Sequence, residues 1–179
     1  MTKKVSLINM KGGVGKSTLA VNLAWQFTGL RKWKKKVLVV DLDPQFNASQ
    51  YLIGVYKYQE ILDKNIPTVW DIFEQQTHAP GRGTPKLLGS QSVLYNVVEY
   101  PDGSRLDLIP SRLELAYSLR NPGQKESLLA HLVSKVEDKY DLILLDCAPT
   151  ESLLTTAAYI TSDFILVPVK PEYLSNMLH

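Results

Sequence analysis

A glycine-rich segment with basic and hydroxyl side chains offers the clearest chemistry in this sequence. It consists of Lys11, Gly12, Gly13, Val14, Gly15, Lys16, Ser17 and Thr18. Glycines let a loop curl so that successive backbone amides face phosphate oxygens, and a helix beginning near Gly15 adds the positive end of its dipole. Lys16 would then reach the outer phosphates, and the Ser17 hydroxyl would bind Mg²⁺. Residues 12–18 therefore predict a phosphate-binding loop, with a glycine-rich turn of no chemical role as the weaker alternative.

Three aspartates follow apolar runs and could manage a metal and a water molecule. Asp41 and Asp43 come after the run 37–40, and alternation along an extended segment directs both side chains to the same side. Asp146 ends the run 142–145. Carboxylates suit a hydrated Mg²⁺ and a water nucleophile. Apolar runs that end in aspartate are common, so Asp146 gains its weight from the other motifs. For Asp43 the simpler alternative is a surface turn led by aspartate and proline.

Strands and helices must hold these side chains together. Continuous apolar runs, typical of strands buried in a parallel sheet, occur at 5–9, 37–40, 142–145 and 164–169. From Gly15 the pattern becomes helical, with one apolar face made of Leu19, Leu23, Phe27 and Leu30. The apolar stripe of 127–139 predicts a second helix. This alternation favours an α/β fold with a doubly wound, mainly parallel sheet, in which ligands bind at the carboxyl ends of strands.

The middle of the chain predicts a hairpin and a loop. A strand at 106–109 would pair with 93–100 across the turn Pro101-Asp102-Gly103. The stretch 77–91 holds several glycines and prolines and is expected to be an exposed loop.

Composition limits the class of protein. The 179 residues suit a single domain, and 45% of them are hydrophobic, a globular value. One cysteine, Cys147, excludes an intrachain disulfide and a thiolate zinc site built by one chain. No stretch approaches the ~20 apolar residues that span a bilayer, and the N-terminus lacks a signal peptide, so we expect a cytoplasmic protein. The basic run 31–36 could touch DNA phosphates, although a solvated loop is the preferred interpretation.

The segment KGGVGKST resembles the deviant Walker A motif of the ParA/MinD family of P-loop ATPases, and most closely its ParA/Soj members. Met10 stands where the ordinary P-loop pattern has its first glycine, and Lys11 is the extra lysine that defines the family's motif. The resemblance implies that Lys11 reaches across a dimer interface to the partner's nucleotide. A cation there would stabilise charge on the transferring phosphoryl group. Without the resemblance, Lys11 would be interpreted as a solvated surface lysine.

Two acidic segments extend the resemblance. Residues 41–45, DLDPQ, resemble the family's switch I, which implies that Asp43 orients or activates the attacking water. It also implies that Asp41 holds the magnesium shell through water, with Asn47 as a further contributor. Residues 140–146 resemble a Walker B motif, so Asp146 would support Mg²⁺.

Residues 147–150 resemble the family's switch II, which is usually Cys-Pro-Pro-Ser. Here Ala148 and Thr150 differ, and Glu151 adds a charge where the family usually has a small or apolar residue. The preferred interpretation is that Thr150 caps the next helix, with Glu151 in its first turn. We expect Cys147 to be a packed small residue and not a nucleophile.

The resemblance runs from Val5 to Tyr173 and implies a function. It implies a slow, magnesium-dependent ATP hydrolase that dimerises on binding ATP, binds DNA without sequence preference and is stimulated by a ParB-like protein. Its task would be partition of plasmid or chromosome DNA, or positioning of cargo, at the nucleoid. Gln45 and Cys147 favour ParA over its relatives. Family members usually continue further, so residues 1–179 are expected to form one nucleotide-binding domain without the family's C-terminal portion.

Other functions remain to be weighed. A membrane-cycling regulator like MinD would need a C-terminal amphipathic helix, which 172–179 is too short to reveal. An electron donor like the nitrogenase iron protein needs two cluster cysteines per chain and is excluded. A module that binds nucleotide without turning it over stays open.

Overall fold

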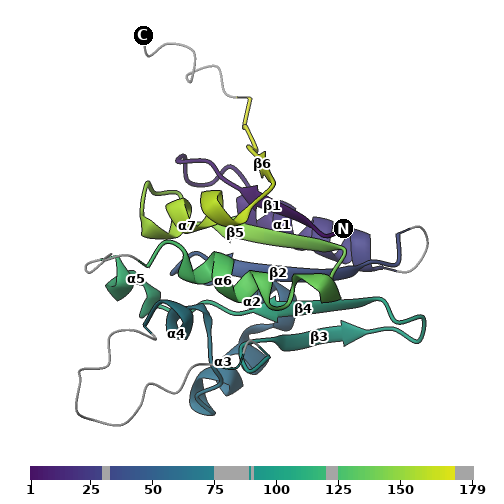
Figure 1. The fold of residues 1–179 in the computed structure, drawn as a ribbon. Helices are drawn as coiled ribbons and strands as arrows, with labels where there is room; N and C mark the ends of the chain where they lie inside the picture. Colours follow the sequence, from purple (N-terminus) through teal and green to yellow (C-terminus); the bar gives the residue numbers. More distant parts are fainter. Residues whose placement is uncertain (30–32, 75–88, 90, 120–124, 172–179) are drawn as a thin grey trace.

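The computed structural model describes residues 1–29, 33–74, 89, 91–119 and 125–171. Within these ranges six strands form one sheet in the order β3-β4-β2-β5-β1-β6 (Figure 1). The strands are β1 (Lys3–Leu7), β2 (Lys36–Leu42), β3 (Tyr95–Glu99), β4 (Arg105–Ile109), β5 (Leu142–Cys147) and β6 (Phe164–Leu166). Neighbours are parallel except the edge pair β3 and β4, which is antiparallel. The five parallel strands therefore all end at the same edge of the sheet.

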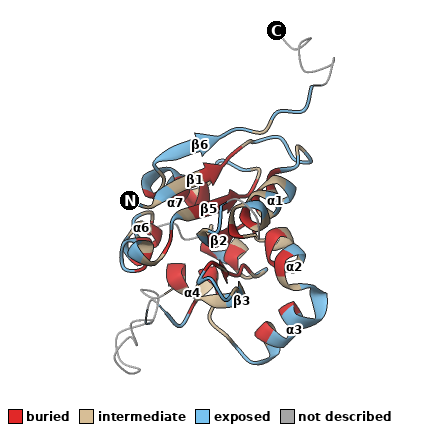
Figure 2. Cartoon of the chain, turned by 90° about the vertical axis from the view of Figure 1, so that its right-hand side faces the viewer, coloured by how far each residue is buried: buried red, intermediate tan, exposed pale blue. Residues whose placement is uncertain are grey.

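Helices cover both faces of this sheet (Figure 2). One side carries α1 (Lys16–Thr28) and α2 (Asn47–Ile53), with α3 (Val55–Asp63) packed against α2. The other side carries α4 (Val69–Glu74), α5 (Leu115–Ser118), α6 (Leu128–Ser134) and α7 (Leu153–Thr161). The predicted doubly wound, mainly parallel α/β fold is confirmed.

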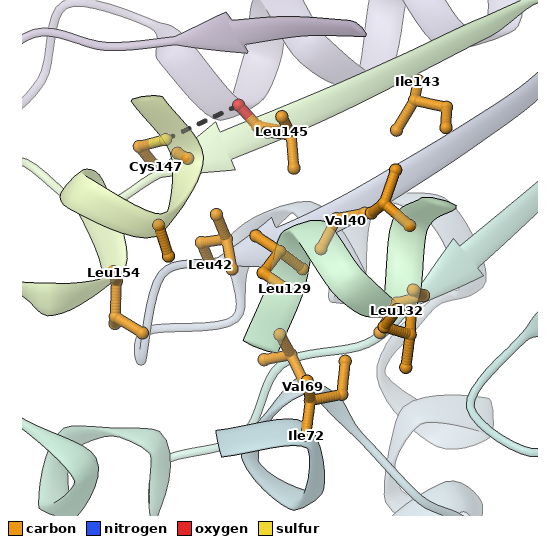
Figure 3. Packing of buried hydrophobic residues seen from close by; sticks show 14 of the residues in the cluster. Val40, Leu42, Val69, Ile72, Leu129, Leu132, Ile143, Leu145, Cys147 and Leu154 are labelled. Carbon is orange, nitrogen blue, oxygen red and sulfur yellow. Dashed lines mark hydrogen bonds between the residues drawn. The ribbon is translucent and has the colours of Figure 1, made fainter. Parts of the chain in front are cut away.

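The central strands contribute to two cores because successive side chains point to opposite faces. In β2, Leu38, Val40 and Leu42 belong to the core under α4, α6 and α7. Figure 3 shows part of this core, including Val40 and Leu42. Val37 and Val39 of the same strand belong to the core under α1 and α2. All five side chains are fully buried, so the strand that leads to Asp43 is fixed on both sides.

Helix α1 meets the sheet through small side chains. Its buried residues, spaced four apart, are Lys16, Ala20, Ala24 and Thr28. The predicted stripe of Leu19, Leu23 and Phe27 is only partly buried and flanks this line, and Leu30 lies outside the described residues. The helix was thus predicted correctly but its most buried line was not, because alanines allow the helix backbone to approach the sheet more closely.

The predicted helix at 127–139 is shorter in the structure. It ends at Ser134, and a 3₁₀ turn, Glu137–Lys139, follows Val136, whose φ is −124°. The hydroxyl of Thr2 lies 2.8 Å from the carbonyl oxygens of both Glu137 and Tyr140 and shares its one hydrogen between them, and the Glu137 carbonyl also accepts the amide of Tyr140 at 2.9 Å. The chain can therefore leave the helix and begin its approach to β5.

Strand β6 differs most from the sequence expectation. The predicted run 164–169 is a strand only to Leu166, and its side chains are exposed and not buried on both faces. In the described part of the chain, β6 pairs with β1 alone, at the edge of the sheet. Pro168 has no amide hydrogen for a ladder, and its carbonyl accepts a hydrogen bond from the Asn9 side chain at 2.8 Å.

The predicted hairpin is present. β3 and β4 pair across the turn that contains Gly103, whose φ is 81°, and a register shift occurs between Asn96 and Val98. Most of the predicted loop 77–91 lies outside the described residues. Three helices between residues 47 and 74 had no counterpart in the sequence prediction, since they are only 7, 9 and 6 residues long and span too few turns to give a clear period.

The described part of the basic run pairs with acids of the same chain. Lys34 Nζ lies 3.4 Å from Asp102 Oδ2, and Lys35 Nζ lies 3.9 Å from Asp141 Oδ1. The Trp33 ring packs on Phe27 with a centroid distance of 5.3 Å. These contacts favour a structural loop over a surface reserved for DNA phosphates; Arg31 and Lys32 lie outside the described residues. Every helix within the described ranges is too short or too polar to cross a bilayer.

Candidate functional site

A cleft of about 260 Å³ opens at the carboxyl edge of the sheet, where β1, β2 and β5 end. Its lining consists of Gly12, Gly13, Gly15, Lys16, Ser17, Thr18, Asp43, Gln45, Asn47, Tyr51 and Pro149. Most of the predicted loop residues and Asp43 thus share one cleft. Of the other predicted residues, Lys11 and Val14 do not line it, and Asp41 and Asp146 are fully buried.

The glycine-rich loop depends on backbone freedom at two positions. Gly13 has φ 73° and Gly15 has φ 87°, both in the left-handed region. A Cβ atom on either glycine would meet no atom within 4 Å, so conformation and not space requires glycine here. Gly15 directly precedes α1, and its carbonyl accepts the amide of Leu19 at 2.8 Å. The loop therefore delivers the chain into the first turn of α1, where free amides suit an anion.

Asn9 organises this loop, and the sequence analysis did not predict it. Its side-chain oxygen accepts the amide of Lys11 at 2.8 Å, and its side-chain nitrogen donates to Pro168. Its carbonyl oxygen lies 2.9 Å from Lys16 Nζ. Asn9 thus ties the start of the loop to the segment after β6 and to the predicted phosphate-binding lysine.

Lys16 is buried, and its ammonium group bonds to the loop itself. Besides Asn9, the carbonyl of Lys11 lies 3.4 Å from Nζ, and the residue is 6% exposed. Neutral carbonyls compensate a buried charge only partly. A phosphate oxygen in the adjoining cleft would be a stronger partner for this ammonium group.

Asp146 is fully buried, and neither of its carboxylate oxygens has a hydrogen-bond partner of normal geometry among the described residues. Burial raises its pKa above the ordinary value, as does the charge of Asp43. The nearby Ser17 hydroxyl and Lys16 ammonium lower that pKa in part. An orphaned carboxylate next to a serine hydroxyl is the donor set that a hard cation such as Mg²⁺ prefers.

Asp41 is buried as well, but its carboxylate is well supplied with donors. Oδ2 accepts the amide of Ser49 at 2.8 Å and its hydroxyl at 2.7 Å, while Oδ1 accepts the amide of Asp43 at 3.1 Å. Burial raises the pKa of Asp41, and the Asp146 charge raises it further, while the hydrogen bonds lower it. The structure thus gives Asp41 a clear role in shaping the loop after β2.

Asp43 faces the cleft from the start of that loop. Its Oδ1 accepts the amide of Gln45 at 2.9 Å, and its carbonyl accepts the amide of Phe46 at 2.8 Å. The residue is 7% exposed. The tight turn thus fixes Asp43, while Gln45 also lines the cleft.

The residues present fit a magnesium nucleotide better than a metal ion alone. The charge of Asp146 raises the pKa of Asp41, and the charge of Asp43 raises the pKa of Asp146, in addition to the effect of burial on both. Among the described residues, no three His, Cys, Asp or Glu side chains converge on one ion. Mg²⁺ commonly takes one or two protein ligands and fills its shell with water and substrate phosphates.

The segment after β5 corrects one prediction. Helix α7 begins at Leu153 with Ser152 as its N-cap, so neither Thr150 caps it nor Glu151 lies in its first turn. Thr150 precedes the helix, and its carbonyl oxygen accepts a hydrogen bond from the hydroxyl of Thr155 in α7 at 2.6 Å. Cys147 is buried in the core shown in Figure 3, and burial raises the pKa of its thiol, as expected of a packed residue.

Lys11 is an exposed residue of the loop. Its amide is held by Asn9, and its side chain is not part of the cleft lining.

Tyr51 and Ser49 belong to the site but were not predicted. Both lie on α2, as does Asn47, which was predicted as a contributor and lines the cleft. Asn47 and Tyr51 are four residues apart, so they share one face of the helix. Recognising that 47–53 is a helix would have revealed this pairing from the sequence.

A larger hollow of about 520 Å³ lies at the opposite edge of the sheet. It is lined by Lys36, Gln91, Leu94, Asn96, Arg105, Asp107 and Lys139. Its buried acid, Asp107, already accepts hydrogen bonds from the Tyr140 hydroxyl at 2.6 Å and from the side-chain nitrogen of Asn96 at 2.8 Å. The smaller cleft is therefore the better candidate site, because its lining residues Lys16 and Ser17 lie beside the buried Asp146, whose oxygens lack a hydrogen-bond partner among the described residues.

Comparisons with known proteins agree with this geometry. Residues 2–177 match the family described as AAA domain. The chain is 32% identical over 176 residues to the sporulation initiation inhibitor protein Soj of Bacillus subtilis, covering 97% of this chain and 60% of Soj. It is 30% identical over 183 residues to the chromosome partitioning protein ParA of Myxococcus xanthus, and the match covers 98% of this chain and 56% of that protein.

The fold is also similar to that of a solved structure, a putative plasmid partition protein from Borrelia burgdorferi bound to AMPPNP. The TM-score is 0.76 at 27% sequence identity, and the match covers 96% of this chain and 64% of that one. The chain spans 48% to 60% of the length of the curated relatives it matches.

Proposed function

The chain belongs to the ParA/MinD type of P-loop ATPases, and we propose that it is a magnesium-dependent ATPase of the ParA kind. The observation that carries the proposal is Asp146, a buried carboxylate near Ser17 and Lys16 whose two oxygens have no hydrogen-bond partner of normal geometry within the described part of the chain. Such a group is costly unless a cation completes it. The glycine-rich loop next to it suits the triphosphate that would bring that cation.

The loop residues would bind ATP. Backbone amides of residues 12–18 would face the β- and γ-phosphates, and Lys16 would exchange its carbonyl partners for a phosphate oxygen. Gly13 and Gly15 keep the loop in the required conformation. AMPPNP bound to the Borrelia burgdorferi protein supports a nucleotide in the equivalent cleft.

Ser17 and Asp146 would hold the metal, with Asp41 acting through water. A bound Mg²⁺ would neutralise charge on the phosphate oxygens. Asp41 accepts three hydrogen bonds from the protein, which suits a distant role better than direct ligation.

Asp43 would orient the attacking water. It lies in the cleft lining, and the Gln45 amide fixes one of its oxygens, which leaves the other for a water molecule. Lys11 would act on the nucleotide of a second copy, where its charge would stabilise the transferring phosphoryl group. Hydrolysis would therefore be slow in the monomer and faster in the dimer.

The wider role that we propose follows the relatives. ATP would drive formation of a homodimer that binds DNA without sequence preference, and a ParB-like protein would stimulate hydrolysis. Partition of plasmid or chromosome DNA, or positioning of cargo, at the nucleoid in the cytoplasm would be the outcome. The names chromosome partitioning protein ParA and plasmid partition protein support this choice.

Equilibrium binding of ATP with Mg²⁺, together with steady-state release of phosphate, tests the proposal. We expect Lys16→Ala to lose nucleotide binding and Asp43→Ala to keep binding but lose turnover. Lys135→Ala, an exposed lysine beyond α6, serves as the matched control and should behave as the unaltered chain. Lack of ATP binding by the unaltered chain would refute the proposal, while binding without turnover would indicate the nucleotide-binding module.

A further inference from the structure

Phe46 occupies a backbone conformation that phenylalanine rarely takes. Its φ is 47° and its ψ is 29°, in the left-handed region. Side chains other than glycine, asparagine and aspartate are uncommon there, because the Cβ atom crowds the backbone. The residue directly follows Gln45, which lines the cleft. Neighbouring contacts must therefore hold the chain in this conformation.

The ring of Phe46 stacks on the ring of Tyr58. The ring centroids are 4.9 Å apart and the planes are inclined by 17°. Tyr58 comes from α3 and is 3% exposed, so it provides a fixed surface for Phe46. Stacked aromatic pairs at this separation attract each other beyond the burial of their surface.

Hydrogen bonds continue from Tyr58 back to the candidate site. The Tyr58 hydroxyl donates to the Ser111 carbonyl at 3.0 Å, and the Ser111 amide donates to Ser49 Oγ at 3.0 Å. The Ser49 hydroxyl donates to Asp41, which accepts the amide of Asp43. These contacts thus form a closed ring that starts and ends on residues 43–49, the turn after β2 and the first turn of α2.

We propose that Phe46 and Tyr58 form an aromatic clamp whose task is to position Asp43 for hydrolysis. This proposal rests on the proposed ATPase function and names two positioning residues for it. Phe46 also donates its amide to the Asp43 carbonyl at 2.8 Å, so a shift of the ring is passed to Asp43 through one short turn. Small displacements of a positioned group can lower a rate by up to about 10²-fold.

The clamp is separate from the phosphate-binding loop. Among the described residues, the ring contact and hydrogen bonds of the clamp are all made outside residues 12–18, and the amides of that loop are arranged by its own glycines and by Asn9. A loosened clamp should therefore slow turnover while ATP still binds. A purely structural role would instead lower nucleotide affinity and turnover together.

Four variants separate the elements of the clamp, with an exposed tyrosine as control. Phe46→Gly removes the ring and relieves the backbone, and Tyr58→Leu removes the facing ring. Phe46→Tyr keeps the stack, and Tyr58→Phe keeps it but removes the hydroxyl. Tyr56→Leu lies on the same helix, and Tyr56 is 93% exposed, so it is the matched control.

We expect kcat for phosphate release to fall on the order of tenfold in Phe46→Gly and Tyr58→Leu, with the Kd for ATP within about threefold. The kcat of Phe46→Tyr and of Tyr56→Leu should stay within about twofold of the unaltered chain. The kcat of Tyr58→Phe should lie between these values and those of the two ring-deleting variants. An unchanged kcat in both ring-deleting variants, or parallel loss of kcat and ATP affinity, would overturn the proposal. If Tyr58→Leu fails to fold, Phe46→Gly decides the outcome, because Phe46 is only partly buried.

Amide hydrogen exchange in the absence of nucleotide gives a second readout. Exchange across residues 43–49 should become faster in Phe46→Gly than in Phe46→Tyr, while exchange in residues 12–18 should not change. This comparison decides on the clamp even if the unaltered chain proves not to hydrolyse ATP. Failure of the proposed function is recognised separately, by lack of ATP binding or turnover in the unaltered chain.

Discussion

Asp41 and Asp146 are paired in register on the neighbouring parallel strands β2 and β5, and both are fully buried. Their surroundings differ sharply. Asp41 accepts hydrogen bonds from Ser49 and from the amide of Asp43, whereas the oxygens of Asp146 have no such partner among the described residues. Two buried carboxylates side by side repel each other. A cation bound at this edge of the sheet, where the glycine-rich loop lies, would therefore stabilise their charged forms.

Removing the charge of Asp146 should stabilise the nucleotide-free protein. Its folded pKa is raised above the ordinary 3.8, so the folded state holds a proton that the unfolded state releases. The fold therefore loses stability as pH rises from about 4 toward neutral. We expect Asp146→Asn to raise the free energy of unfolding at pH 8 by roughly 1–3 kcal/mol, measured by urea denaturation without Mg²⁺.

The same substitution should abolish magnesium-dependent ATP retention, as a stabilising change at a functional site often does. The gain in unfolding free energy should shrink at pH 4, where both proteins carry a neutral group at this position. Asp138→Asn, an exposed acid on the 3₁₀ turn, is the control and should show neither effect. Equal stability of Asp146→Asn and the unaltered chain at pH 8 would contradict the interpretation.

Ser49→Ala should destabilise the fold and disturb the loop after β2. The Ser49 hydroxyl donates to Asp41 and accepts the Ser111 amide, and all three residues are fully buried. Its loss leaves a buried amide without an acceptor, which costs about 1–3 kcal/mol. Denaturant unfolding measures the effect, and Ser134→Ala, an exposed serine that bonds within its own helix, is the matched control. A loss no larger than that of the control would argue against the Ser49 bridge.

The glycines of the loop should respond differently to alanine. Gly15 has φ 87°, whereas Gly12 does not lie in the left-handed region, and both have open space for a Cβ atom. We expect Gly15→Ala to cost about 1 kcal/mol of stability and to weaken ATP binding markedly, with Gly12→Ala milder on both measures. Thermal unfolding and nucleotide titration decide, and equal effects at the two positions would show that backbone conformation is not the cause.

Lys11→Ala should leave ATP binding in the monomer nearly unchanged and reduce turnover. If Lys11 acts on the nucleotide of the second copy, mixing inactive Lys11→Ala with inactive Asp43→Ala should restore activity. Mixed dimers then contain one complete site, so an equal mixture should reach roughly a quarter of the unaltered rate. Phosphate release at varied mixing ratios measures this, and no recovery would place Lys11 outside the partner's site.

The sequence by itself determined the parts of this protein that neighbouring residues encode. Continuous apolar runs indicated the buried strands β2 and β5, and the glycines and Lys16 indicated a strand-to-helix loop suited to phosphate. The parallel order of strands then implied that Asp43 would lie at the same edge as this loop, because parallel strands all end on one side.

Only the tertiary structure decided what surrounds the acids. Ser49 and Ser111 are 62 residues apart in the chain, yet the amide of one bonds to the hydroxyl of the other. Phe46 meets Tyr58 because α3 packs against α2 and is held there by the Tyr58 hydroxyl, which donates to the Ser111 carbonyl. Such contacts depend on how loops direct helices in space, which hydrophobic period and local spacing do not specify. The exposure of β6 has the same origin, since its apolar run encodes a strand but not its place at the edge.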